Sequence, residues 1–103
     1  MTVKLTVIYD NPTDPDAFEE HYASEHAGLG ARVPDVLRVE TAKVFPKEDG
    51  SPTPAYRTAD LYFADYDTAC AALASPEGAA LLSDARTLGS AGVKFLLSDV
   101  ETA

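Results

Sequence analysis

Apolar and polar residues alternate along four stretches of the chain, and each alternation predicts a β-strand. Side chains of a strand point in turn to its two faces, so a period of two marks a strand with one buried face. Residues 3–9 show this most clearly, because one of their faces consists of Val3, Leu5, Val7 and Tyr9. The other predicted strands are residues 36–45, 56–64 and 93–100.

Residues 14–29 follow a helical period instead, and both histidines of the chain lie within them. Asp14 suits the N-cap of this single predicted helix, and Pro15 suits its first turn. At about 100° per residue, His26 lies at the edge of a stripe formed by Phe18, Tyr22, Glu25 and Leu29. A carboxylate and an imidazole beside an apolar stripe are costly to bury, so their position there indicates a candidate site.

Two further helical segments follow the third strand. The first is capped by Asp65 or Asp67 and ends near residue 74, and the second begins at Ser75 and ends near residue 88. Residues 46–55 contain three prolines and form a loop between strands. The order is βαββαβ, with the second helical part divided at Pro76. This is the order of the α+β ferredoxin-like fold, an antiparallel sheet with helices on one face.

The face of the sheet away from the helices is not uniformly polar in this prediction. Ile8, Leu96 and Val100 lie opposite the main apolar sets of their strands. Because water would meet these side chains in a monomer, we expect a second copy of the chain to bury them. The simplest closed arrangement is a two-fold homodimer, a dimeric α+β barrel.

The composition fits one domain over residues 1–103 and limits the classes of partner. A net charge of −9 disfavours nucleic acids and anionic membrane surfaces. No stretch approaches the roughly 18 apolar residues of a membrane span. The single Cys70 cannot form an internal disulfide, which is compatible with a cytoplasmic protein. No phosphate loop or dinucleotide motif occurs, so no cofactor is predicted.

Short motifs follow one another along nearly the whole chain. The first half contains Phe18-x3-Tyr22-x3-His26-x2-Leu29 and then Val33-Pro34. The second half contains Leu61-Tyr62-Phe63, Ser75-Pro76-Glu77-Gly78 and Asp84. In their order and spacing these motifs resemble the EthD family of the dimeric α+β barrel superfamily. Two positions depart from the family pattern, since Asp35 replaces a usual glycine and Leu88 a usual aromatic residue.

The resemblance implies a homodimer and a pocket for a hydrophobic small molecule between helices and sheet. Name-giving members of the family accompany the bacterial degradation of an alkyl ether. Relatives in the superfamily include cofactor-free monooxygenases, polyketide cyclases and isomerases, and the label oxidoreductase is often attached to EthD proteins. A shared fold does not fix the reaction, so the resemblance leaves the reaction open.

His26 is the first candidate catalytic residue, because an imidazole takes up or releases a proton near neutral pH. Tyr22 lies one turn earlier, where its hydroxyl would hold a substrate oxygen. The candidate substrate-binding residues are Tyr62, Phe18 and Leu29. Each candidate has a structural alternative: His26 as an anchor of the helix end, and the aromatic residues as core.

The remaining polar residues do not predict a metal site. His21 and His26 are five residues apart, about 140° around an α-helix, so we predict that they do not share a metal. His21 and Glu25 offer two ligands, but nothing completes a set. Glu25 has three possible positions: paired with Arg32 or Arg38, lining the pocket, or facing the partner subunit. We favour the structural ion pair, and we interpret Asp84 as solvated or locally paired.

Three functions remain open from the sequence. The first is a cofactor-free enzyme, an oxidoreductase, cyclase or isomerase with His26 as general acid or base. The second is a carrier or accessory protein for a neighbouring oxygenase, and the third is a dimerisation module with a filled core. An enclosed cavity beside the His26 ring would favour the first two, and solid packing there would disfavour both.

Overall fold

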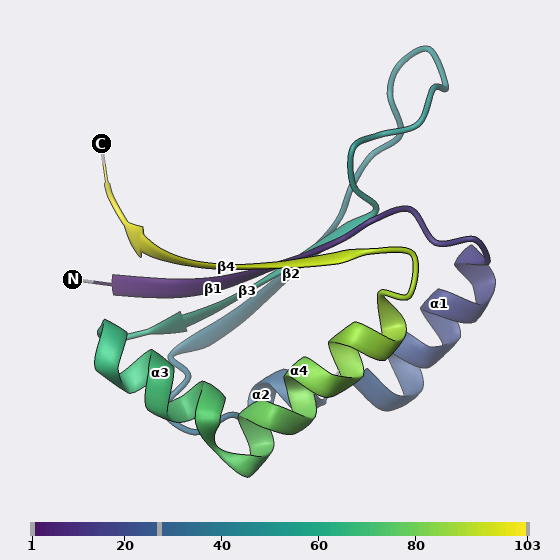
Figure 1. Ribbon diagram of the computed structural model, residues 1–103. Coiled ribbons are helices and arrows are strands. Elements are labelled where there is room, and N and C mark those ends of the chain that lie inside the picture. The colour runs from purple at the N-terminus through teal and green to yellow at the C-terminus, as the bar shows by residue number, and fades with distance from the viewer. Residues whose placement is uncertain (1, 27, 103) are drawn as a thin grey trace.

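One sheet of four antiparallel strands forms the first layer of the protein in a computed structural model, which describes residues 2–26 and 28–102 (Figure 1). The strands are β1 (Thr2–Tyr9), β2 (Arg38–Lys43), β3 (Arg57–Phe63) and β4 (Val93–Val100). Their order across the sheet is β2-β3-β1-β4, so β2 and β4 are the edges. This arrangement confirms the predicted α+β ferredoxin-like fold.

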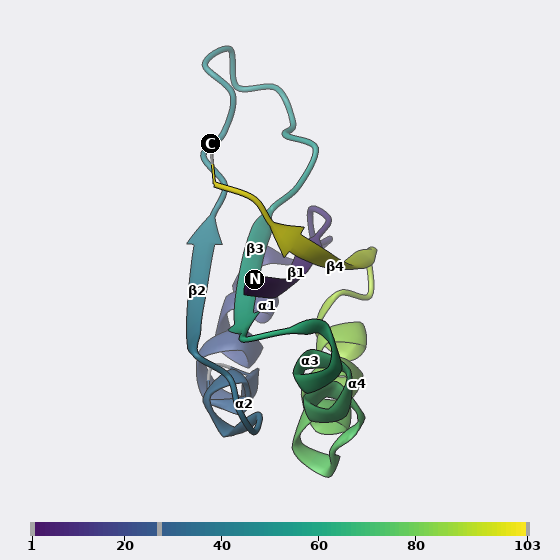
Figure 2. The same cartoon turned by 90° about the vertical axis from the view of Figure 1, so that its left-hand side faces the viewer.

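The helices form a second layer on one side of the sheet (Figure 1 and Figure 2). They are α1 (Pro15–His21), the π-helical turn η1 (Tyr22–His26), α2 (Leu29–Arg32), α3 (Tyr66–Ala74) and α4 (Pro76–Leu88). Three helices begin at the predicted caps, since Asp14, Asp65 and Ser75 accept hydrogen bonds from the first turns of α1, α3 and α4. Within the residues that the structure describes, none of the helices has the length and apolar composition to cross a bilayer.

The hydrophobic core fills the space between the two layers. The predicted alternation of β1 is confirmed, because Val3, Leu5, Val7 and Tyr9 are buried while the residues between them are partly exposed. The helices contribute Phe18, Ala69, Ala72, Leu81, Ala85 and Leu88 to the same cluster. The core is therefore centred on the inner strands β1 and β3, and it is thinner beneath the edge strand β2, whose residues are all exposed.

The prediction of one continuous helix over residues 14–29 is wrong. The α-helix ends at His21, a π-helical turn follows, and α2 begins only at Leu29. Ala27, which the predicted helix included, lies outside the described residues. The Ser24 hydroxyl donates a hydrogen bond to the Glu20 carbonyl at 2.8 Å, a contact that bends helices because it competes for that carbonyl. The second predicted strand is also too long, since β2 covers only Arg38–Lys43.

No helix of the described chain covers the opposite face of the sheet (Figure 1). Strand register places Thr6, Leu96 and Asp60 side by side on this face, and Leu96 is 49% exposed. Tyr62 lies on the same face, with its hydroxyl 2.8 Å from Glu40 and its ring beneath the Arg38 guanidinium. Apolar and paired polar side chains are thus mixed on a surface that the monomer leaves open.

Candidate active site

The buried imidazole of His26 is held on both of its nitrogens. Nδ1 lies 2.7 Å from Oδ2 of Asp84, and Nε2 lies 3.1 Å from the Tyr9 hydroxyl. Because an ionised carboxylate only accepts, Nδ1 carries the proton that Asp84 accepts. In the neutral ring Nε2 then accepts from the hydroxyl of Tyr9. The three side chains come from β1, η1 and α4, so the tertiary fold assembles this group.

Asp84 also binds the second histidine. Its other oxygen, Oδ1, lies 2.9 Å from Nε2 of His21, and Nδ1 of His21 lies 3.2 Å from Oε2 of Glu25. Burial opposes ionisation of Asp84, but the hydrogen bonds from His21 and His26 outweigh it and hold the pKa of the carboxyl below its usual value. Asp84 is therefore an anion shared by two imidazoles.

The convergence of His21 and His26 on one carboxylate contradicts the geometry expected from the sequence. In an α-helix a spacing of five residues would turn the two rings to different faces. The π-helical turn Tyr22–His26 has hydrogen bonds of the i→i+5 type, which bring residues five apart closer to alignment. The two rings consequently reach the same side chain on α4.

Tyr9 is the hydrogen-bond donor at the inner end of this group. Burial raises the pKa of its phenol far above the ordinary value, and the nearby Tyr22 and Asp84 add to the effect. The hydroxyl therefore keeps its proton over the physiological range and remains available as a donor to His26.

A small hollow lies beside the His26 ring. It is lined by Tyr22, His26, Gly30, Val39, Thr41, Ala59, Leu61 and Leu81, and its volume is about 20 Å³. That volume is close to what one water molecule needs and far below the volume of an aromatic ring. The space between the first helical segment and the sheet is thus nearly filled in the isolated chain.

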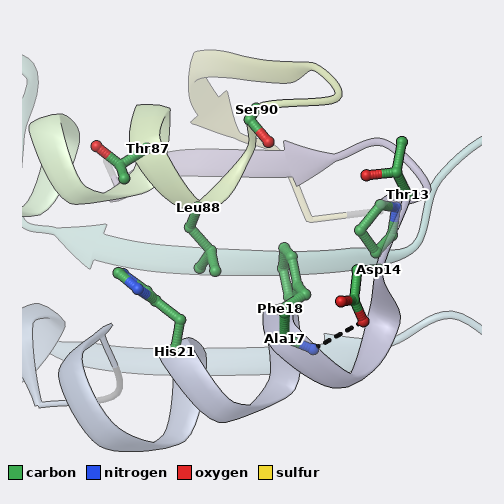
Figure 3. A pocket seen from close by; sticks show the side chains of 9 residues that line it. Thr13, Asp14, Ala17, Phe18, His21, Thr87, Leu88 and Ser90 are labelled. Carbon is green, nitrogen blue, oxygen red and sulfur yellow. Dashed lines mark hydrogen bonds between the residues drawn. The ribbon is translucent and has the colours of Figure 1, made fainter.

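A larger groove opens on the surface between α1 and α4. It has a volume of about 210 Å³, and Figure 3 shows Phe18 and Leu88 pointing toward one another across it, with His21 at one end. The rim is polar, with Thr13, Asp14, Thr87 and Ser90 among its residues. Of the hydrogen-bonded group around Asp84, His21 lines this groove, whereas the His26 ring is buried.

The structure brings together only some of the predicted site residues. Tyr22 and His26 are neighbours, with ring centroids 5.4 Å apart. Phe18 belongs to the core and to the surface groove, and Leu29 lines a separate groove with Arg32. Tyr62 lies on the opposite face of the sheet, so within one chain it cannot line the hollow beside His26.

Two members of the site were not predicted as such. The sequence places Tyr9 on the apolar face of its strand. Its position at the end of that face was the one indication that a hydroxyl would be buried there. Asp84 was expected to be solvated or locally paired, although it matches a family motif. Glu25, interpreted as a partner of Arg32 or Arg38, pairs instead with His21.

Asp84 also supplies the third potential metal ligand that the sequence lacked. One ligand atom each of His21, Glu25 and Asp84 lies within 4.8 Å of the others. Both ring nitrogens of His21 already lie beside these carboxylates: Nε2 is hydrogen-bonded to Asp84, and Nδ1 is at ion-pair distance from Glu25. The prediction of no metal stays a prediction.

The fold and the site define a small α+β protein with a buried histidine–carboxylate pair at the end of its first helical segment. A sequence model of the EthD domain matches residues 10–88. A relative from Rhodococcus erythropolis, named an uncharacterized 11.0 kDa protein in the thcB-thcC intergenic region, is 41% identical over 99 residues, or 96% of this chain and 95% of the relative. The chain therefore belongs to the EthD family.

Solved structures agree with this family. The crystal structure of an EthD family protein from Bacillus halodurans is similar to this chain with 26% identity and a TM-score of 0.90, covering 98% of this chain and 100% of that one. SnoaB, a cofactor-independent oxygenase from Streptomyces nogalater, is similar with 20% identity and a TM-score of 0.67, covering 99% and 95%. The second likeness concerns the fold alone.

Proposed function

We propose that this EthD protein binds an apolar, aromatic small molecule beside His26, and that His26 moves a proton to or from it without a cofactor. The observation that supports this most is the buried imidazole between Asp84 and Tyr9. Asp84 fixes the orientation of the ring and stabilises the imidazolium that forms when Nε2 takes up a proton. Oxidation of an activated phenol, cyclisation and isomerisation all require such a proton transfer.

The position of Nε2 sets the route of the proton. Nδ1 is committed to Asp84, so only Nε2, which the Tyr9 hydroxyl contacts, can exchange a proton with a ligand. The raised pKa of Tyr9 keeps its hydroxyl protonated as the donor to Nε2. His26 is therefore the base or acid, and Tyr9 is a positioning residue that orients Nε2.

Ligand binding requires the hollow of about 20 Å³ to enlarge. The wall most suited to move is the side formed by β2 and α2, because β2 is an exposed edge strand and α2 has only four residues. Tyr22 is only partly buried, so rotation of its ring would add space next to His26. Tight packing is also the observation that favours the alternative, a dimerisation module without a ligand.

We propose further that two copies associate through the open face of the sheet. Leu96, a large apolar side chain, is 49% exposed there in a monomer. Large apolar side chains with this exposure are typical of a surface that a partner covers. The identical copy is the simplest partner, since a two-fold axis buries the same face twice.

Binding is tested with 2-naphthol, an aromatic phenol that is uncharged at pH 7, by titration into ¹⁵N-labelled protein. We expect saturable shifts of the amide signals of Gly30, Thr41 and Ala59, which line the hollow. The amides of Ala17 and Ser90 in the surface groove serve as the internal control. Shifts confined to the groove, or none at all, would contradict a ligand site beside His26.

Proton transfer is tested with the same probe in deuterated water. Exchange at C1 of 2-naphthol needs a base to remove the hydroxyl proton, delivery of deuterium to C1, and loss of the C1 proton to restore the aromatic ring. We expect the wild type to accelerate this exchange and His26→Gln to abolish the acceleration. His21→Gln is the matched control, because His21 also binds Asp84 but does not line the hollow. Binding without accelerated exchange would favour a carrier.

A further inference from the structure

A second group of polar side chains meets the ring of Tyr22, which His26 also contacts. Its centre is Arg57 of β3, whose guanidinium lies 4.3 Å from the centroid of the Tyr22 ring. Nη2 of Arg57 donates to both oxygens of Glu19 at 3.1 Å. Glu19 also accepts from the Tyr56 hydroxyl at 2.9 Å and pairs with Lys43 at 3.1 Å. We call these four side chains the Arg57 cluster: Glu19, Lys43, Tyr56 and Arg57.

The Arg57 cluster lies next to the hollow without lining it, since Arg57 contacts the ring of Tyr22, one of the wall residues. Strand pairing places Arg57 between Tyr9 of β1 and Lys43 of β2, on the side of the sheet that faces the helices. Thr41, two residues before Lys43 on the same face of β2, lines the hollow. A planar ligand that enlarges the hollow along Tyr22 would therefore come within reach of both His26 and Arg57.

The cluster has one positive charge in excess, since Arg57 and Lys43 face the single carboxylate of Glu19. This excess lies in a chain whose net charge is −9, so it is a local exception to an acidic protein. Moreover, Nε of Arg57 is buried and has no hydrogen-bond partner among the described residues. A buried donor without an acceptor costs free energy, and an acceptor brought by a ligand would remove that cost.

We infer that the ligand has an anionic oxygen, a carboxylate or a phenolate, which Arg57 and Lys43 bind while the ring lies against Tyr22. The inference rests on the proposed function and narrows its substrate class to anionic aromatic molecules. A guanidinium is suited to this role because its fork of donors contacts an oxyanion and its plane stacks on a ring. Glu19 holds the two cations in place while no anion is bound.

The experiment compares 2-naphthoate with 2-naphthol, since the two share a ring system and differ in charge at pH 7. We expect the wild type to bind 2-naphthoate at least about tenfold more tightly, the difference that one charge-assisted hydrogen bond supplies. Arg57→Gln should abolish the difference, and Lys43→Gln, on an exposed side chain, should reduce it without disturbing the fold. Arg86→Gln is the matched control, because Arg86 also lies over a ring, that of Phe95, but far from this cluster along the chain.

The two proposals fail in different ways. If both probes bind with equal affinity and Arg57→Gln changes the affinity for neither probe, the anion-binding inference is wrong and the proposed ligand site stands. If 2-naphthol and 2-naphthoate both fail to bind, the inference and the proposed ligand site are both wrong. The inference would also be wrong if Arg86→Gln lost as much affinity for 2-naphthoate as Arg57→Gln does, because such a loss would reflect the net charge of the protein alone.

Discussion

The replacement of Asp84 by asparagine removes one negative charge where two imidazoles meet and keeps the shape of the side chain. The amide has one accepting oxygen, so it can keep one of the two hydrogen bonds at 2.7 and 2.9 Å and must turn a donor toward the other imidazole. Hydrogen bonds to charged groups contribute about 1.5–3 kcal/mol each.

The exposure of each histidine decides how much of this hydrogen-bond free energy the variant loses. The His21 side chain is 27% exposed, so water can replace part of its bond, whereas the His26 side chain is only 7% exposed. We therefore expect Asp84→Asn to lower the free energy of unfolding by about 2–3 kcal/mol at pH 7. For a chain of this size the melting temperature should fall by roughly 10 °C or more.

The effect must also depend on pH in a defined direction. The pKa of Asp84 is lowered in the folded protein, so the unfolded chain takes up this proton first as the pH falls. The stabilisation is complete above the ordinary carboxyl pKa of about 3.9 and is lost as the pH falls through the folded value. Asp84→Asn has no carboxyl to protonate, so its stability should not fall in this way. The difference in the free energy of unfolding between wild type and Asp84→Asn should therefore shrink in acid.

Urea unfolding followed by circular dichroism measures these differences, at one fixed protein concentration because association would contribute to stability. Glu48→Gln is the control, since it removes the same charge from an exposed loop residue. A loss below about 0.5 kcal/mol in Asp84→Asn, the usual range for surface substitutions, would refute the assignment of Asp84 as the anion that holds both histidines.

Three further predictions concern other parts of the molecule. Tyr9→Phe should lower the free energy of unfolding by about 1–2 kcal/mol, because it leaves Nε2 of His26 unpaired. The wild type should lose stability above about pH 10, where the tyrosine of the unfolded chain ionises while Tyr9 in the fold keeps its proton. Tyr9→Phe should reduce this loss. Gly78→Ala should lower the free energy of unfolding by about 2 kcal/mol or more, because the added Cβ would meet backbone atoms of Ala72 and Leu73. In the control Gly28→Ala the added Cβ meets nothing within 4 Å, so this variant should be tolerated. Chemical denaturation of both variants measures the difference. Leu96→Asp should shift a concentration-dependent dimer toward monomer in analytical ultracentrifugation, and an unchanged sedimentation profile would place the dimer contact elsewhere.

Periodicity and capping chemistry were sufficient to predict most of the elements. Val93–Val100 was predicted to the residue, because its alternation is bounded by glycine and by polar residues. Ser75 and Pro76 correctly divided the second helical part, since a serine cap followed by proline has a single favourable arrangement. These signals are local, so a sequence displays them without knowledge of the tertiary contacts.

The size of the hollow could not be predicted in the same way. Its volume depends on how Tyr22, Val39 and Leu81 from three separate elements fit together, and small shifts of each would change it severalfold. The pairing of Glu25 with His21 has a different cause: its i, i+4 spacing is visible in the sequence, but Arg32 and Arg38 were preferred there as partners of Glu25. Long-range geometry therefore limited the prediction of the site more than that of the fold.

The π-helical turn shows how one local departure changes the chemistry of the whole site. A regular α-helix would have turned His21 and His26 apart and left one of them without the Asp84 carboxylate. The turn instead lets the outer and the buried imidazole bind different oxygens of one anion, so both rings are anchored to α4. Since such turns cost helix stability and occur often at functional sites, the departure from regular geometry is itself an argument that the His26 position is functional.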